Sequence, residues 1–245
     1  VTVARDGQII HGREIRSLIF LSLNDFGTVL YSARYTDGTR SLNAWRPRFG
    51  WNSITPSGAW DDENNWAFSM LPTIGDDIFL ESASGAEIQG PIADTELNSI
   101  SIGADVNLNL GAGSLTVTDR IILAHGGVIS GAGLLTGDMD NEGAVNVEDG
   151  ATLELDGDVI NNGSIRIGAN GELILSGAYS GDGRIEGAQG LTRFNGELSP
   201  GSSPGLLEIA GDSTLGANSS TTLELAGSSR GDEFDAINVG GRIEL

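Results

Sequence analysis

Hydrophobic and polar residues alternate in short segments along most of the chain, and the same alternation returns at a fixed interval. Residues 141–160, NEGAVNVEDGATLELDGDVI, align without gaps on residues 161–180, NNGSIRIGANGELILSGAYS. Each block carries two alternating segments, such as the one with Val145 and Val147, separated by glycine and asparagine. Alternation with a period of two is typical of strands that bury one face, and glycine and asparagine suit the turns between them.

A repeat of roughly 20 residues, with two or three short strands in each repeat, predicts a β-solenoid. Coils stacked about 4.8 Å apart pair every strand with its neighbours and share one aliphatic core. We expect an all-β fold with a right-handed parallel β-helix over residues 78–245, because parallel connections are almost always right-handed. No 3.6-residue periodicity persists, which argues against a helical fold. An antiparallel β-sandwich stays open, although it does not predict a gapless repeat.

The beginning of the chain differs from the repeat region in charge and in aromatic content. Residues 1–50 carry seven arginines and four acids, a net charge of +3, whereas residues 51–245 carry six arginines and thirty acids, a net charge of −24. Eleven of the fourteen aromatic residues lie in residues 1–80. We therefore expect three parts: a basic β-rich segment (1–50), a tryptophan-rich cap or opening motif (51–77) and the solenoid (78–245).

The composition narrows the possible partners. The formal net charge is −21, and all 13 basic residues are arginine. This balance argues against nucleic acid and against an anionic membrane surface, because both require a basic face. No run reaches 18 apolar residues, so no membrane span is predicted. The absence of cysteine excludes disulfides, thiol catalysis and cysteine-bound zinc. A start at Val1 and a stop within a strand-like pattern suggest a processed product or a fragment of a longer precursor.

Three segments resemble motifs of exported bacterial proteins. Residues 3–39 contain VARDGQ, LNDFGTVLYSA and TDGT, which resemble one copy of an NxxG-type repeat. The matching positions are Asn24, Gly27, Ala33, Asp37 and Gly38. Residues 58–80 resemble the W…NW…P…DD motif that opens Gly-rich β-repeat regions, and residues 198–245 resemble the SPGxSPG repeat of autotransporter passengers and PEP-CTERM-type surface proteins. The resemblance implies export, a right-handed parallel β-helix and a cell-surface or matrix role.

Some residues invite a catalytic interpretation, which we weigh against a structural one. Paired carboxylates serve glycoside hydrolysis. The pairs are Asp76 with Asp77, Asp138 with Asp140, and Asp156 with Asp158. Beside turn glycines, such pairs are typical of solvated solenoid corners, and we favour that interpretation. A lyase needs a basic residue near its substrate, but the repeat region has six scattered arginines and no lysine. His11 and His125 are far apart and lack a catalytic motif. We predict no catalytic residues and no enzyme activity.

Calcium is the one cofactor that the sequence suggests. Carboxylate and amide oxygens, which calcium prefers, gather in DDENN (61–65) and again near residue 76. The candidate ligands are Asp61, Asp62, Asp76 and Asp77. No EF-hand loop or calcium-binding nonapeptide is present, so capping of a turn by these side chains is the alternative. The segment SPGSSPG (199–205) lacks the lysine of a phosphate-binding loop and predicts a rigid turn.

All four tryptophans fall within one short stretch: Trp45, Trp51, Trp60 and Trp66. They could plug the end of the solenoid, because an open end exposes unpaired backbone and apolar side chains. A subunit interface and a platform for stacking sugars are the alternatives. We favour the cap.

The apolar run IRSLIFLSL (15–23) is too short for a membrane anchor and predicts a buried strand. It also offers a route to self-association, because the basic segment of one copy could attract the acidic body of another and add a strand to it. The residues proposed for this contact are Ile15, Leu18, Ile19, Phe20, Leu21 and Leu23. A head-to-tail contact that does not close would produce a filament. The alternative is that the segment caps its own solenoid.

Together these observations predict a non-enzymatic extracellular structural protein of the bacterial surface or biofilm matrix. Its expected partner is itself, as a homopolymer that assembles through the N-terminal segment, with surface polysaccharide as a further partner. The alternative is a surface adhesin or carbohydrate-binding module, and a polysaccharide lyase or hydrolase ranks last.

Overall fold

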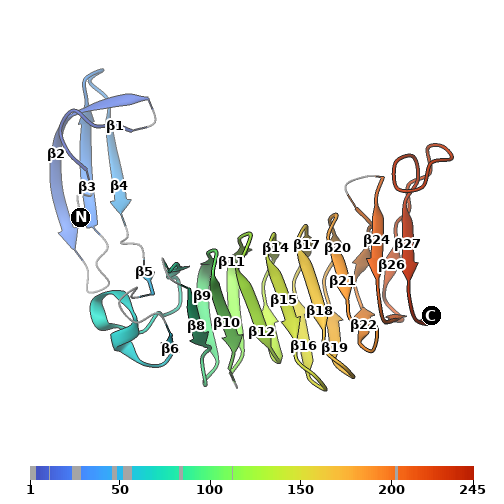
Figure 1. The fold of residues 1–245 in the computed structure, drawn as a ribbon. Coiled ribbons are helices and arrows are strands. Elements are labelled where there is room, and N and C mark those ends of the chain that lie inside the picture. Colours follow the sequence, from blue (N-terminus) through green and yellow to red (C-terminus); the bar gives the residue numbers. More distant parts are fainter. Residues whose placement is uncertain are drawn as a thin grey trace. The chain divides into compact units, whose positions relative to one another are not determined.

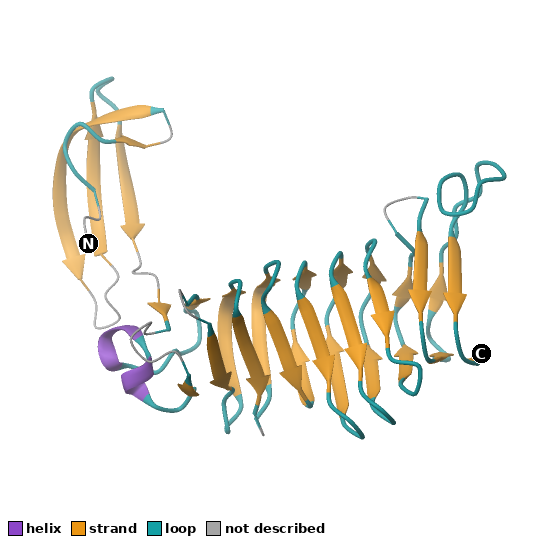
Figure 2. Cartoon of the chain, in the orientation of Figure 1, coloured by secondary structure: helices purple, strands orange, loops and turns teal. Residues whose placement is uncertain are grey.

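The computed structural model describes most of the chain and shows an all-β protein, as the sequence predicts. The described residues are 4–10, 12–23, 29–45, 49–51, 57–82, 85–111, 113–201 and 204–245. Besides strands and loops, the described residues contain two short 3₁₀ turns, η1 (Glu63–Asn65) and η2 (Ala67–Ser69) (Figure 2). The chain divides into two compact units, Val1–Arg48 and Phe49–Leu245.

The N-terminal unit is a small antiparallel sheet in the order β1-β2-β3-β4 (Figure 1). Its strands are β1 (Ile9–Ile10), β2 (Arg13–Leu23), β3 (Val29–Tyr35) and β4 (Arg40–Trp45). Among its described side chains, only Ile15, Ala33 and Tyr35 form a buried hydrophobic cluster. The Arg13 guanidinium lies 4.3 Å from the centre of the Tyr35 ring and covers one side of this cluster. The described part of this unit therefore has strand pairing but very little core.

The second unit is a parallel β-solenoid, which rules out the antiparallel sandwich. One face is a nine-stranded sheet. Its strands are β6 (Gly58–Ala59), β8 (Ala86–Gln89), β10 (Val106–Leu110), β12 (Val128–Gly131), β15 (Ala144–Val147), β18 (Ser164–Ile167), β21 (Arg184–Glu186), β24 (Leu206–Ile209) and β27 (Ala236–Val239). Figure 1 shows these strands stacked side by side along the solenoid.

The other, fifteen-stranded sheet forms two further faces. Long strands β9 (Thr95–Ile102) and β11 (Leu115–Leu123) contribute to both faces, and β11 pairs with two separate strands of the next coil. One face then holds β13 (Gly133–Thr136), β16 (Thr152–Asp156), β19 (Glu172–Leu175), β22 (Leu191–Phe194), β25 (Asp212–Leu215) and β28 (Ile243–Glu244). The other holds β5 (Phe49–Gly50), β7 (Asp77–Leu80), β14 (Met139–Asn141), β17 (Val159–Asn161), β20 (Tyr179–Ser180), β23 (Glu197–Leu198) and β26 (Ser220–Thr221).

A column of aliphatic residues on the inner side of the nine-stranded sheet shows how the coils stack. Its members pair in register from coil to coil: Ile88, Leu108, Ile129, Val145, Ile165, Ile185, Ile209 and Val239. Most steps along this column are close to the predicted coil length of roughly 20 residues, which is thereby confirmed. The shortest step leads from Ile129 to Val145, and the longest leads from Ile209 to Val239.

The longest coil contains an excursion over residues 222–235, between β26 and β27. The carboxylate of Asp235 is buried and accepts the backbone N–H groups of Gly205 and Glu224, each at 2.7 Å. Gly205 ends the SPGSSPG segment of the preceding coil, so one carboxylate joins two loops at the same corner. This contact keeps the extra residues outside the solenoid without disturbing the ladder.

The solenoid begins earlier in the chain than the sequence suggests. Strand β5 pairs with β7, and β6 pairs with β8, so both sheets already start within the expected cap segment. The expected boundary at residue 78 thus divides segments that form one body. Two-residue strands next to tryptophan carry too little alternation to be recognised from sequence.

Candidate functional site

Strand β2 has one edge that is almost entirely free. Strand β1 pairs only with Arg13 and Glu14, and backbone hydrogen bonds to Gly7 and Gln8 extend this contact as far as Ile15. Strand β3 occupies the other edge of β2. Within the described part of the chain, no strand pairs with the outer edge of residues 16–23. Such an edge presents unpaired N–H and C=O groups that can pair with another chain.

This edge is apolar as well as unpaired. The exposed fractions are 61% for Ile19, 64% for Phe20 and 49% for Leu21. These values correct the prediction of a buried strand, because none of the described residues of this unit covers Ile19, Phe20 or Leu21. Ile15 is only 1% exposed, so it belongs to the core rather than to a contact surface. Leu18 is half-buried against this core, and the side chain of Leu23 lies outside the described residues.

The apolar surface continues across the sheet. Ile19 pairs with Ser32, which in turn pairs with Leu42 on β4, so the three side chains form one row. Leu42 is 66% exposed, much as Ile19 is. With three buried core residues among its described side chains and this much exposed apolar surface, the sheet gains little stability from the packing that the structure describes. Burial against a partner would supply what the unit itself lacks.

The tryptophans separate into two groups. Trp51, Trp60 and Trp66 are nearly fully buried, and the ring of Trp66 lies 5.1 Å from that of Trp51 and 4.7 Å from that of Trp60, both edge to face. The Nε1–H of Trp66 donates to the carbonyl of Trp60 at 2.6 Å. This cluster covers the first coil, where β5 and β6 begin the two sheets, which is the place that a cap would occupy. Buried rings leave no face for a sugar. Trp45 lies on β4 in the other unit, and its side chain is outside the described residues.

The four acids proposed for calcium each serve as a hydrogen-bond acceptor. The acceptors are Asp61, Asp62, Asp76 and Asp77, and their donors include Ile92, Asn64, Thr73 and Ser99, respectively. Asp62 caps η1 through the backbone N–H of Asn64 at 3.0 Å. In the part of the chain that the structure describes, no three His, Cys, Asp or Glu side chains gather as a metal site would require. The geometry therefore favours capping, and calcium gains no support from it.

The paired carboxylates of the repeat region link one coil to the next. Asp138 accepts the backbone N–H of Asp158 at 3.0 Å, and Asp158 accepts that of Ala178 at 2.9 Å. Asp140 forms an ion pair with Arg120 at 2.7 Å, although both side chains are partly exposed. These contacts give all three carboxylates structural roles, Asp138 and Asp158 at solenoid corners and Asp140 on β14. Of the two histidines, His125 is exposed at such a corner and His11 lies outside the described residues.

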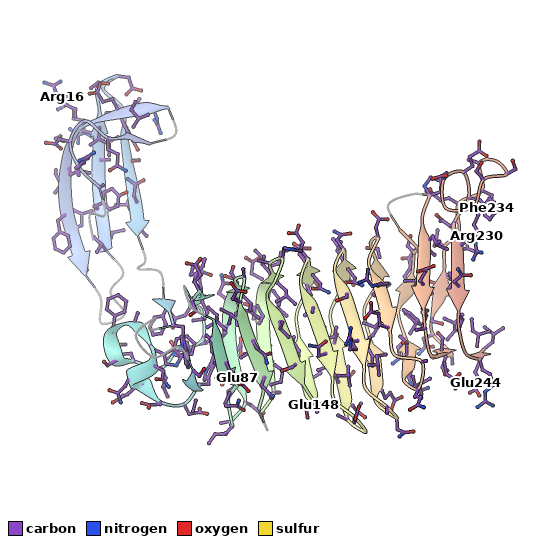
Figure 3. The ribbon with its side chains drawn as sticks, in the orientation of Figure 1. Arg16, Glu87, Glu148, Arg230, Phe234 and Glu244 are labelled. Atoms are coloured by element: carbon purple, nitrogen blue, oxygen red, sulfur yellow. The ribbon has the colours of Figure 1, made fainter. Side chains whose placement is uncertain are left out.

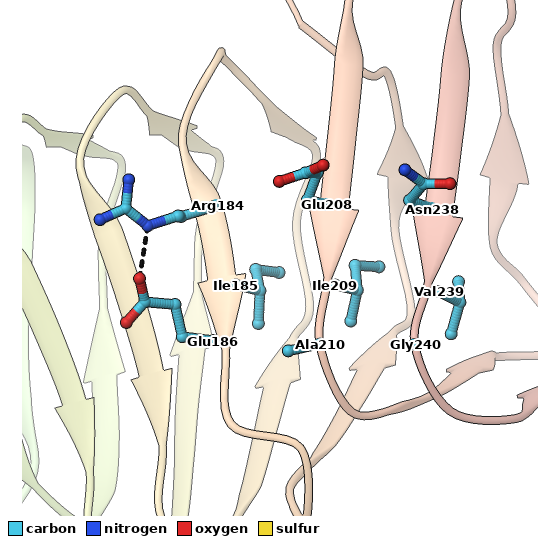
Figure 4. Close-up of a pocket in the computed structure, with 9 residues that line it drawn as sticks. All are labelled: Arg184, Ile185, Glu186, Glu208, Ile209, Ala210, Asn238, Val239 and Gly240. Atoms are coloured by element: carbon cyan, nitrogen blue, oxygen red, sulfur yellow. Dashed lines mark hydrogen bonds and ion pairs between the residues drawn. The ribbon is translucent and has the colours of Figure 1, made fainter.

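A shallow groove of about 410 Å³ lies on the nine-stranded sheet near its C-terminal end (Figure 4). Arg184, Glu208 and Asn238 point outward from successive coils along it. The Arg184 guanidinium forms an ion pair with Glu186, and this contact lowers the pKa of that carboxyl. Arg166 pairs with the same carboxylate at 3.0 Å. Arg184, Glu186 and Arg166 thus neutralise one another in part, and the residues that line the groove bring together no nucleophile and base.

Comparison with known proteins finds no match, so the assignment of a function rests on the observations above. No family model, no curated protein and no solved structure matches this chain. Among the described residues, no helix is long and apolar enough to cross a membrane. The free edge of β2 is therefore the feature that best indicates a function.

Proposed function

We propose that this protein is a non-enzymatic structural protein that associates with copies of itself through the free edge of β2. The solenoid supplies a stiff acidic rod, and the N-terminal unit supplies the joint. In keeping with the resemblance to exported repeat proteins, we place it at the bacterial surface or in the extracellular matrix.

The single observation that carries the proposal is the exposed apolar edge of residues 16–23. Natural sheets protect such edges with charges, prolines or covering segments. Here the edge carries one charge, Arg16, and is apolar at its centre. The N-terminal unit also has a net charge of +3, whereas the solenoid has a net charge of −24. Repulsion between solenoids therefore favours contacts made through the N-terminal unit.

The architecture of the solenoid supports a mechanical role. Nine strands stacked in one sheet, with a spacing of about 4.8 Å, give a continuous ladder about 40 Å long. Carboxylates at the corners of the fifteen-stranded sheet also join successive coils, as Asp138 and Asp158 do. A rod held by strand pairing and aliphatic stacking keeps its form without disulfides.

Sedimentation velocity of the full chain and two variants tests the proposal. Ile19→Lys places a charge on the free edge of β2. We expect it to weaken association at least tenfold, because the new lysine would face either the lysine of the second copy or an apolar side chain. Leu42→Lys is the matched control, since Leu42 is equally exposed in the same row but lies on β4. It should associate as the wild type does.

Circular dichroism of both variants establishes that the sheets remain folded. Equal association of all three proteins would overturn the role of β2. Loss of association in Leu42→Lys alone would assign the contact to β4 instead.

A further inference from the structure

The free edge of β2 has a sequence that reads almost the same in both directions. The segment SLIFLS (17–22) begins and ends with serine and has leucine next to each serine. Two strands that pair in antiparallel orientation about a twofold axis meet in this way, each residue facing its counterpart. The pattern therefore indicates which element pairs with β2, and not only that some element does.

The bulge near the centre of β2 completes this symmetry. The pairing with β3 shifts by one residue between Phe20 and Ser22, so Phe20 and Leu21 together oppose a single residue of β3. Ser17 pairs with Arg34 and Ser22 with Leu30, which lie four residues apart on β3. Residues four apart on a regular strand share one face, so Ser17 and Ser22 also share one face. With the bulge counted as one position, the segment is symmetrical about Ile19.

We infer that β2 pairs with β2 of a second copy, in antiparallel orientation, with Ile19 on the twofold axis. This inference rests on the proposed function and names its partner element. Ser17 then lies beside Ser22 of the second copy, and Leu18 lies beside the bulge formed by Phe20 and Leu21. The result is one continuous sheet through both N-terminal units, in which the exposed side chains of Ile19 from the two copies touch.

Charge and contact area agree with this occupant. Residues 16–23 contain no acid, and the one charge, Arg16, lies at the end of the segment, where it meets Leu23 of the second copy rather than another charge. Like charges directly opposite each other are thereby avoided. A contact along eight residues of strand edge buries less than the roughly 800 Å² per partner of a standard interface. We therefore expect a reversible dimer with a Kd of about 10–100 μM.

Cysteine crosslinking tests the pairing directly, because the wild-type chain has no cysteine. In Ile19→Cys, the two thiols face each other across the axis, within the distance that a disulfide requires. We expect most of the protein to become a covalent dimer on mild oxidation. A mixture of Ser17→Cys and Ser22→Cys should give a mixed dimer, with much less product from either variant alone. The control, Leu42→Cys, should associate as the wild type does but should form little covalent dimer under the same conditions.

The mass of the wild-type chain separates the two ways in which this test can fail. If the wild type associates but Ile19→Cys does not crosslink, the symmetrical pairing is wrong and the proposed function stands, as for head-to-tail addition of β2 to a solenoid. Crosslinking of Leu42→Cys to the same extent would also overturn the pairing, because random collision would explain both. A wild type that stays monomeric up to millimolar concentration overturns the pairing and the proposed function together.

Discussion

At the scale of single residues, buried polar side chains connect the coils from within. Asn141 and Asn161 are almost completely buried, and the Nδ2 group of Asn141 donates to the Oδ1 atom of Asn161 at 2.7 Å. Asn161 in turn donates to the hydroxyl of Tyr179 at 2.8 Å. Burial raises the pKa of Tyr179, so this hydroxyl stays protonated and neutral. The three side chains form a short ladder across three coils.

Replacing the middle member of this ladder should be costly. Asn161→Ala removes the partner of the Tyr179 hydroxyl and of the Nδ2 group of Asn141. We expect a loss of about 2 kcal/mol in the free energy of unfolding. Asn162→Ala is the neighbouring control: Asn162 is exposed and accepts the backbone N–H of Asp182 at 3.2 Å. Its cost should be below about 1 kcal/mol. Urea titration measures both, and equal losses would contradict a special role for the buried ladder.

The sequence predicted these asparagines as turn residues because they stand, with glycine, between the alternating apolar segments. It could not show that their side chains turn inward, because only the stacking of one coil on the next brings Asn141 against Asn161. The glycines are different, since their role follows from spacing. A Cβ on Gly163 would lie 2.2 Å from the carbonyl oxygen of Gly143, one coil earlier. Glycine therefore recurs at these positions because the backbones of successive coils touch there.

At the scale of elements, carboxylates at the corners join each coil to the following one. Asp94 accepts the backbone N–H of Ser114 at 3.0 Å and its hydroxyl at 2.9 Å, 20 residues along the chain. These hydrogen bonds lower the pKa of Asp94. Asp149 accepts the N–H of Ala169 in the same way, at 2.8 Å. The acidic composition thus has a local structural cause at these corners, besides its effect on solubility.

This arrangement predicts how stability depends on pH. Because the pKa of Asp94 is lower in the folded state, its contribution is complete above the unfolded value, near 4, and is lost as pH falls through the folded value. The difference in urea midpoint between wild type and Asp94→Ala should therefore be largest at pH 7 and shrink below about pH 4. The general repulsion among the acids also changes over this pH range, so the measurements use about 0.5 M salt, which screens it.

Glu148 supplies the control for this experiment. It is an exposed acid at a solenoid corner (Figure 3). Glu148→Ala should change the urea midpoint little at any pH. A difference for Asp94→Ala that stays constant from pH 7 to pH 2.5 would contradict the ionic character of its contacts.

Strand β2 shows where the apolar pattern misleads at this scale. A nearly continuous apolar run is typical of a strand covered on both faces, so the sequence predicts burial. The described residues of the N-terminal unit form a single sheet, and within them β2 is covered at Ile15 and in part at Leu18. The number of layers depends on elements far apart in the chain, and short-range alternation contains no information about it.

At the scale of the whole molecule, the repeat predicted the architecture well. The gapless alignment of residues 141–160 with 161–180 corresponds to the pairing of β15 with β18, β16 with β19 and β17 with β20. The short coil that ends at Val145 and the long coil that ends at Val239 were not predicted, because insertions and deletions at corners leave no trace in the alternation. The candidate contact surface was predicted in part: Ile19, Phe20 and Leu21 are exposed on β2, whereas Ile15 is buried.

The central claim is that two copies associate through the free edge of β2, and hydrogen exchange of its amides tests this most directly. The full chain would be compared at about 1 μM and at about 500 μM, below and above the expected Kd. We predict that the amides of residues 16–23 that point away from β3 become protected at the higher concentration, while those of β4 exchange at the same rate in both samples. Fast exchange of these outward-pointing amides at both concentrations would contradict the claim.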